Sequence, residues 1–233
     1  MVDLRPRGIQ SIPLVIKNLI IINVLVWVAE LTFGGNFIGL LKLHYHKSPN
    51  FRIWQLMTHM FLHDPSSIGH LLWNMFALWM FGSALEENWG AKRFLLFYLI
   101  SGVGAALIQL GVLAVEMNYL DYKFGLADAA TQQGLILRAG GIYYFGAYGA
   151  SGAITGVMAA FAYLFPNYPV QMFMIPVPIK VKYLVIAYFL IDLFAGINPQ
   201  EGDDVAHFAH VGGAIVGLIL VTTMNKNNRR TFY

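Results

Sequence analysis

The sequence reads YGASG at 148–152, and this run opens an apolar stretch that ends at Phe165. A serine between small residues at the start of a hydrophobic helix is an unusual place for a nucleophile, because a base must reach it from another helix. A second short run, AHVGG at 209–213, begins a later apolar stretch. His210 in that run is therefore the candidate base for Ser151.

The composition is that of a membrane protein. Hydrophobic residues make up 58% of the 233 residues and charged residues 12%, whereas a soluble domain carries about 25% charge. The chain has no cysteine, which excludes disulfides and thiolate chemistry. The net charge of +3 is small, and the basic residues gather at predicted helix ends. We therefore expect a lipid bilayer around the chain and no nucleic-acid partner.

Six apolar stretches are candidate membrane-spanning helices. They cover residues 13–33, 68–89, 91–117, 151–165, 180–197 and 205–224. Cytoplasmic termini place the short basic clusters inside, as the positive-inside rule requires. We expect an all-α polytopic protein with one membrane domain over 1–233, both termini cytoplasmic and a loose tail at 225–233. Because Arg5 and Arg7 precede an apolar run too long for a signal peptide, the first helix is expected to remain as an anchor.

The short fourth stretch sets the depth of the serine. Two prolines end it, so 151–165 spans about 15 residues and roughly 22 Å, which leaves Ser151 roughly 8 Å below the outer surface of the hydrocarbon core. The same count places His210 in the sixth stretch and Asn74 in the second at about the same depth. Three polar side chains from three helices are thus expected to meet just below the outer face.

Small residues would let the fourth and sixth stretches pack backbone against backbone. They recur at every fourth position in the fourth stretch and line one face of the sixth: Gly152, Gly156, Ala160, Ala206, Gly213, Ala214 and Gly217. Membrane helices approach closely where small residues line the contact, which would bring His210 beside Ser151. Serine and glycine could also serve packing alone. A histidine inside the membrane at the matching depth favours catalysis.

Acyl transfer also needs donors for a developing oxyanion. His70 and Asn74 are four residues apart and share one face of the second predicted helix. The backbone N–H of Ser151, at a helix N-terminus, is a third donor. His70 and Asn74 could instead make interhelical hydrogen bonds only, and their spacing does not decide between the two roles.

Three other polar residues are weaker candidates. His59 and His63 also lie four residues apart, but no third metal ligand is evident, so a structural role is favoured and no metal site is expected. Asp192 lies near the outer end of the fifth stretch. An acid inside the membrane is a functional candidate, although a cap or a helix–helix hydrogen bond would also explain it. The long loop 118–150 receives no assignment.

Together these residues resemble the rhomboid family of intramembrane serine proteases, in its minimal bacterial six-helix form. The resemblance covers nearly the whole chain and rests on three motifs in the family order: HxxxN in HLLWN at 70–74, GxSG in GASG at 149–152, and AHxxGxxxG at 209–217. It implies cleavage of peptide bonds in or near transmembrane segments of other proteins, without a cofactor, in what is expected to be the bacterial cytoplasmic membrane.

The resemblance also implies roles for single residues. Ser151 and His210 would form a dyad without an acidic third member and act through an acyl-enzyme, with His70 and Asn74 assisting the oxyanion. Phe194 on the fifth helix is the candidate substrate gate.

The sequence departs from the family pattern at two positions. Members often place an aromatic ring four residues after the serine, where it stacks on the catalytic imidazole, and this chain has Thr155 there. The usual Trp-Arg pair of the first loop is Trp54-Gln55.

Two functions outside catalysis remain. A silent rhomboid-like protein that binds membrane clients would typically lack part of the dyad. A small transporter or channel would carry polar groups through the full thickness of the membrane, whereas here they concentrate near the outer face.

Overall fold

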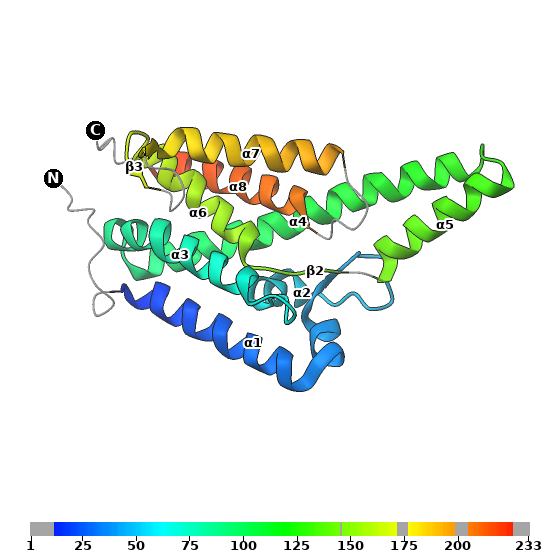
Figure 1. The fold of residues 1–233 in the computed structure, drawn as a ribbon, viewed down its shortest axis with the longest axis horizontal. Helices are drawn as coiled ribbons and strands as arrows, with labels where there is room; N and C mark the ends of the chain where they lie inside the picture. Colours follow the sequence, from blue (N-terminus) through cyan, green and yellow to red (C-terminus); the bar gives the residue numbers. More distant parts are fainter. Residues whose placement is uncertain (1–11, 145, 172–176, 199–204, 226–233) are drawn as a thin grey trace.

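The computed structural model describes residues 12–144, 146–171, 177–198 and 205–225. Each of the six predicted stretches contains a helix: α1 Leu14–Leu41, α3 Ile68–Trp89, α4 Ala91–Phe124, α6 Ser151–Leu164, α7 Val181–Ile197 and α8 His207–Asn225. α1 and α7 lie at opposite sides of the bundle, with α3, α6 and α8 between them (Figure 1). The predictions for Arg5, Arg7 and residues 226–233 lie outside the described residues.

Within the described residues, four helices are long and apolar enough to cross a membrane: α1, α3, α4 and α8. α6 is a shorter apolar helix of 14 residues, as the prolines after Phe165 led us to expect. Apart from four strands of two residues each, the regular structure in the described part of the chain is helical. The protein is therefore of the all-helical polytopic class. Six crossings and cytoplasmic termini stay predictions.

α1 does not end at residue 33 as predicted. Gly34 has φ 66° and ψ −155°, a backbone conformation that favours glycine, and the chain resumes helical geometry beyond this kink as far as Leu41. The apolar span and a short terminal helix thus run in different directions (Figure 1). The glycine pair at 34–35 marks the end of the apolar span, and helical structure continues past it.

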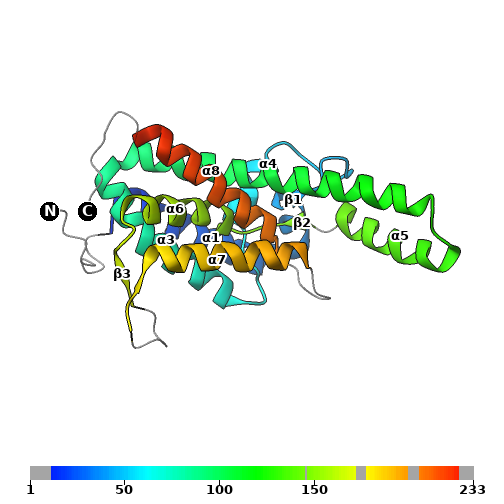
Figure 2. The ribbon, with the colours of Figure 1, turned by 90° about the horizontal axis from the view of Figure 1, so that it is seen from above.

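The loop 118–150, to which the sequence analysis gave no structure, is largely helical. α4 continues past residue 117 to Phe124, and α5 (Ala129–Tyr144) folds back along it. The pair projects beyond the other helices (Figure 2). An ion pair joins Arg138 to Glu116 at 2.5 Å, and the ring of Tyr45 packs edge-on against Tyr143 with centroids 5.6 Å apart.

Two short pairs of strands link loops that connect the helices. β1 (Leu43–His44) pairs antiparallel with β2 (Gly146–Ala147), and β3 (Pro169–Val170) pairs with β4 (Ile179–Lys180). The first pair fastens the loop after α1 to the segment that leads into α6.

The first loop is built around a buried glutamine. Gln55 begins α2 (Gln55–Thr58), which the 3-10 helix η2 (His59–Phe61) continues. The Nε2 of Gln55 donates to the carbonyls of Leu40 and Asn50 at 3.2 and 3.0 Å. The Oε1 of Gln55 accepts the backbone N–H of His44 at 3.2 Å. Gln55 therefore organises the loop through neutral hydrogen bonds at the position where the family usually has arginine.

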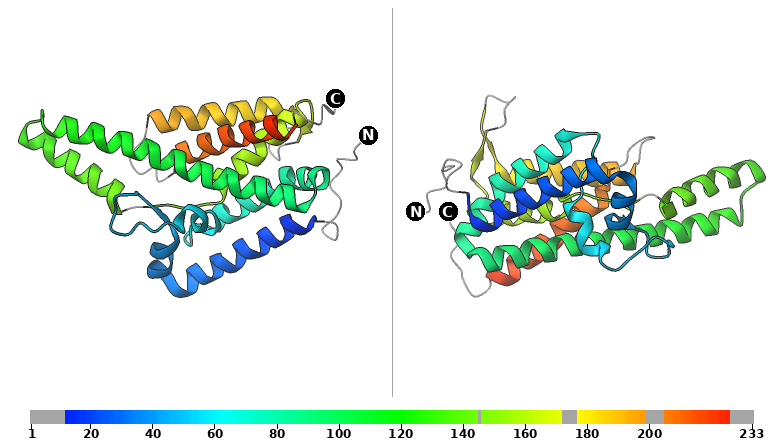
Figure 3. Two further views of the ribbon diagram at one scale, coloured as in Figure 1. Left: turned by 180° about the vertical axis from the view of Figure 1, so that it is seen from behind. Right: turned by 90° about the horizontal axis from the view of Figure 1, so that it is seen from below.

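α6 occupies the middle of the bundle and is buried along most of its length. α4 runs along the back of the molecule past α8 and α6 (Figure 3). The faces of α6 and α8 are in direct backbone contact: a Cβ added at Gly217 would lie 2.5 Å from the backbone of Gly156. Small residues at this contact are thus required by space, as the sequence pattern predicted.

Two buried carboxylates tie the outer helix α1 to the rest. Glu86 on α3 accepts the backbone N–H groups of Val15 and Ile16 at 2.8 and 2.9 Å, at the N-terminus of α1. Glu30 on α1 accepts the backbone N–H of His63 at 3.0 Å. Each carboxylate satisfies donors that would otherwise be buried without a partner.

Candidate active site

Ser151 and His210 are in hydrogen-bond contact. Ser151 is the first residue of α6, and its Oγ lies 2.7 Å from Nε2 of His210 on α8. The close approach of the two helices makes this distance possible, because a Cβ at Gly213 would overlap the carbonyl oxygen of Gly152. The side chain of His210 is 11% exposed, so the pair lies largely out of solvent.

The segment before Ser151 is fixed from two directions. Gly149 has φ +135°, which L side chains rarely adopt, and its N–H donates to the carbonyl of His59 at 2.9 Å. β2 holds the preceding residues against β1. The first loop therefore sets the position at which α6 starts, and with it the position of the serine.

His70 presents a ring N–H to the region beside Ser151. The backbone N–H of Asp64 donates to Nδ1 of His70 at 3.3 Å, so the proton of the neutral imidazole is on Nε2. A Cβ placed on Gly149 would lie 3.3 Å from both Nε2 of His70 and Oγ of Ser151. Glycine thus leaves a small space between a donor and the candidate nucleophile.

Asn74 is buried one turn further along α3. Its Nδ2 donates to the carbonyl of His70 at 2.9 Å, which occupies one of its two N–H groups. Among the described residues it has no direct hydrogen bond to Ser151. The structure therefore brings Ser151, His210 and His70 together, and it places Asn74 behind His70.

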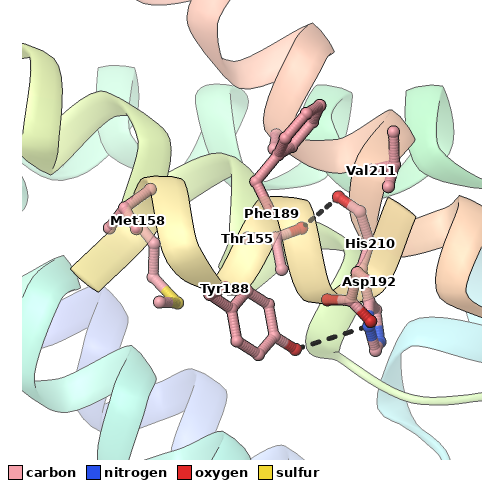
Figure 4. Close-up of a pocket in the computed structure, with 9 residues that line it drawn as sticks. Thr155, Met158, Tyr188, Phe189, Asp192, His210 and Val211 are labelled. Carbon is pink, nitrogen blue, oxygen red and sulfur yellow. Dashed lines mark hydrogen bonds and ion pairs between the residues drawn. The ribbon is translucent and has the colours of Figure 1, made fainter. Parts of the chain in front are cut away.

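The other ring nitrogen of His210 faces α7. Nδ1 lies 3.1 Å from Oδ1 of Asp192 and 3.4 Å from the hydroxyl of Tyr188. The same carboxylate oxygen lies 2.6 Å from Nδ1 of His207. Figure 4 shows Tyr188 and Asp192 directed from α7 towards His210. A dyad without an acidic neighbour was expected, and the structure instead places a carboxylate at the ring.

Thr155 makes a hydrogen bond in place of the family's aromatic stacking. Its Oγ1 lies 2.9 Å from the backbone carbonyl of His210 (Figure 4). It also lies 2.9 Å from the carbonyl of Gly152. The aromatic neighbour of the imidazole comes from α7 instead, where the Tyr188 ring has its centroid 6.2 Å from that of His210 and is tilted by 31°.

Tyr188 was not among the site residues predicted from the sequence. It precedes Asp192 by four residues, so the two share one face of α7. That spacing was a usable signal.

His59 and His63 lie outside the membrane-spanning helices, on η2 and in the loop after it. Burial lowers the pKa of His59 to about 4, and burial together with the neighbouring His70 lowers the pKa of His63 to about 4. The Nδ1 of His59 bonds the carbonyl of Gln55 at 2.9 Å, and the ring of His63 packs on that of His70 with centroids 5.2 Å apart. These contacts agree with a structural role.

One group of side chains could supply three ligand atoms to a metal ion. Atoms of Asp192, His207 and His210 all lie within 4.8 Å of one another. Oδ1 of Asp192 lies 2.6 Å from Nδ1 of His207 and 3.1 Å from Nδ1 of His210, which are hydrogen-bond distances. Zinc ligands lie about 2.0–2.1 Å from the ion, so two ligands of one tetrahedral ion would be farther from each other than these atoms are. The arrangement therefore fits a hydrogen-bonded cluster better than a metal site.

Phe194, the candidate gate, lies on α7 two residues beyond Asp192. The residue is 69% exposed. Most of α7 is similar, because Val181 and Asp192 are its only buried residues. The gate stays a prediction.

Comparison with known proteins identifies relatives along nearly the whole chain. The rhomboid domain model matches residues 50–227. Rhomboid protease AarA of Providencia stuartii is 30% identical over 215 residues, which cover 87% of this chain and 69% of that protein. RHOMBOID-like protein 12, mitochondrial, of Arabidopsis thaliana is 27% identical over 93% of this chain and 60% of its own length. Rhomboid protease GlpG of Yersinia pestis is 23% identical over 80% of this chain and 54% of its own length.

Proposed function

Because the chain belongs to the rhomboid family, we propose that it is an intramembrane serine endopeptidase that cleaves transmembrane segments of other membrane proteins near the outer face. The observation that carries the proposal is the 2.7 Å contact between Oγ of Ser151 and Nε2 of His210. A hydroxyl next to an unprotonated imidazole nitrogen can lose its proton as it attacks a carbonyl carbon.

In the proposed reaction Ser151 attacks the scissile carbonyl and its proton passes to Nε2 of His210. The imidazolium then protonates the leaving amine, which leaves an acyl-enzyme on Ser151. Water attacks this ester while Nε2 of His210 takes a proton from the water. The bond between the acyl carbon and Oγ of Ser151 then breaks, the imidazolium returns its proton to Oγ, and the carboxylic acid product departs. No cofactor takes part in these steps.

Three N–H groups are proposed to stabilise the oxyanion. The Nε2–H of His70 is supported by the hydrogen bond that Asp64 donates to the other ring nitrogen. The backbone N–H of Ser151 belongs to the first turn of α6, where amide groups have no partner within the helix. Asn74 would contribute its second N–H, and it also orders the backbone of His70.

Substrate entry and location belong to the same proposal. A transmembrane segment would enter past α7, where Phe194 is the gate, because this helix is the least buried of those around the site.

The similarity to Providencia and Yersinia proteins supports the bacterial cytoplasmic membrane as the location of this protein. The mitochondrial Arabidopsis relative makes an organelle membrane the competing location, which fractionation of the source cells distinguishes. A silent client-binding role is not favoured, since Ser151, His210, His70 and Asn74 are all present.

The test is proteolysis in reconstituted vesicles. The purified chain is mixed in liposomes with a set of single-span model proteins, and the products are identified by mass spectrometry. We expect cleavage in the outer part of a span, and its loss in Ser151→Ala and in His210→Ala.

Ser101→Ala is the matched control, because Ser101 is a buried serine on α4. Cleavage that persists in Ser151→Ala would contradict the proposal.

A further inference from the structure

We propose that Asp192 is the positioning residue for His210, so that this chain works with a Ser151–His210–Asp192 triad in place of a dyad. The inference rests on the proposed function, since it assigns a role within the same reaction. It concerns a residue on α7, which carries none of the three family motifs.

The first argument is the hydrogen-bond pattern around the ring. Oδ1 of Asp192 lies 3.1 Å from Nδ1 of His210, and the opposite nitrogen, Nε2, lies 2.7 Å from Oγ of Ser151. A carboxylate can only accept hydrogen bonds, so Nδ1 must carry the hydrogen. In the neutral ring Nε2 is then an acceptor, which is the tautomer that a base for Ser151 needs.

The second argument is burial. Asp192 is 5% exposed, and it is the only polar residue among the buried residues of α7. A carboxylate in such a place is costly unless donors surround it. Two imidazoles of α8 lie at hydrogen-bond distance from its Oδ1, His207 at 2.6 Å and His210 at 3.1 Å.

The third argument concerns what holds the ring in the absence of stacking. Thr155 fixes the backbone of His210 through its carbonyl and leaves the rotation of the side chain free. The ring of Tyr188, with its centroid 6.2 Å away, offers only a loose contact. A carboxylate at Nδ1 fixes the ring plane and the tautomer together, so Asp192 supplies what the missing aromatic platform would have supplied.

The alternative is a purely structural role, in which Asp192 connects α7 to α8 through its hydrogen bond with His207. Five groups face His210 from the surrounding helices: Ser151 on α6, Tyr188 and Asp192 on α7, His207 on α8 and, through electrostatics, His70 on α3. Substitutions at Asp192 and His207 distinguish the two roles. The carboxylate of Asp192 lies at hydrogen-bond distance from Nδ1 of His210, whereas His207 meets that ring only edge-on, with centroids 6.3 Å apart.

The experiment compares wild type, Asp192→Asn, Asp192→Glu and His207→Gln in detergent micelles. ¹⁵N NMR of histidine-labelled protein reports which nitrogen of His210 carries the hydrogen, and this readout requires no activity. Fluorophosphonate labelling rates and the kcat and KM for a cleaved model protein report function.

We expect the Nδ1–H tautomer at His210 in wild type and a shift towards Nε2–H in Asp192→Asn. The labelling rate and kcat of that variant should fall by about 10²- to 10⁴-fold with little change in KM. Asp192→Glu should recover part of the loss, and His207→Gln should stay within about tenfold of wild type.

An unchanged tautomer with near-normal labelling in Asp192→Asn would overturn the inference. So would a loss in His207→Gln as large as that in Asp192→Asn, because that pattern indicates a tie between helices. A wild type with the Nδ1–H tautomer but no labelling would contradict the proposed function instead, and would leave the hydrogen bond of Asp192 in place.

Discussion

At the residue scale, several groups around Ser151 are held in place by hydrogen bonds to a neighbour. The backbone N–H of Asp64 determines the tautomer of His70, Thr155 anchors the backbone of His210, and Gln55 holds the first loop. Groups that are already oriented cost no reorganisation when charge develops on a substrate. A preorganised set of this kind is what acyl transfer below a membrane surface requires.

We predict that the folded protein loses stability in acid because two histidines of the first loop are buried. His59 and His63 have a pKa of about 4 in the folded protein because burial disfavours their charged form. The unfolded chain binds these protons near pH 6.5, so it holds more protons than the folded state between about pH 6.5 and 4. Stability therefore falls as pH decreases through this interval, by about 2 kcal/mol for each histidine at pH 5.

Thermal unfolding in detergent at pH 7 and pH 5 measures this effect. His63→Leu should reduce the stability lost between the two values by about 2 kcal/mol. The matched control is His46→Leu, which removes an exposed histidine of the same loop. An equal loss in wild type and His63→Leu would show that His63 does not take up a proton on unfolding.

At the element scale, glycines determine the distance between α6 and α8. Gly213 has no room for a side chain, because a Cβ would overlap the carbonyl oxygen of Gly152 and lie 2.6 Å from Oγ1 of Thr155. We expect Gly213→Ala to push the helices apart, to lower stability by about 1–3 kcal/mol and to lengthen the contact between Ser151 and His210.

Gly111→Ala on α4 is the control, since a Cβ at Gly111 meets nothing within 4 Å. Unfolding temperature and fluorophosphonate labelling should both fall in Gly213→Ala and stay near wild type in Gly111→Ala. Similar values for the two variants would mean that the helices can separate without harm.

The start of α1 depends on one carboxylate of α3. Glu86 accepts the N–H groups of Val15 and Ile16, where a negative charge also suits the helix dipole. Glu86→Ala leaves two buried donors unpaired and should lower stability by about 2–4 kcal/mol. The neighbouring Glu87 is exposed, so Glu87→Ala should change the unfolding temperature little. A small effect at both positions would contradict this role for Glu86.

The sequence predicted those helices whose position follows from a long apolar stretch or from a repeat of small residues. It did not predict the helix that lacks both patterns. The pattern at 151–165 predicted α6 and its contact with α8, because close packing leaves a repeat of small residues. α5 was missed because its polar positions resemble a loop, and its contacts with α4 depend on pairs such as Arg138 and Glu116. The contact of Asp192 with His210 was also left open, since spacing along α7 does not give its rotation against α8.

At the scale of the whole molecule, the first loop and the connection between α3 and α4 lie at opposite ends of α3. The predicted topology places Lys47 outside and Lys92 in the cytoplasm. The chain has no cysteine, so Lys47→Cys and Lys92→Cys each introduce a single label at an exposed position. In intact cells an impermeant thiol reagent should label Lys47→Cys alone, and it should label both after lysis. Labelling of Lys92→Cys in intact cells would reverse the topology.

At the same scale, the proposed function requires an activated serine that is accessible from the outer side of the membrane. The measurement that tests this most directly is fluorophosphonate labelling of the purified protein, with the modified residue identified by peptide mass spectrometry. We expect one adduct, on Ser151, in wild type and in Ser101→Ala, and none in His210→Ala, where the base is absent. A folded wild type without an adduct on Ser151, or an equal adduct in His210→Ala, would contradict activation of the serine by this histidine.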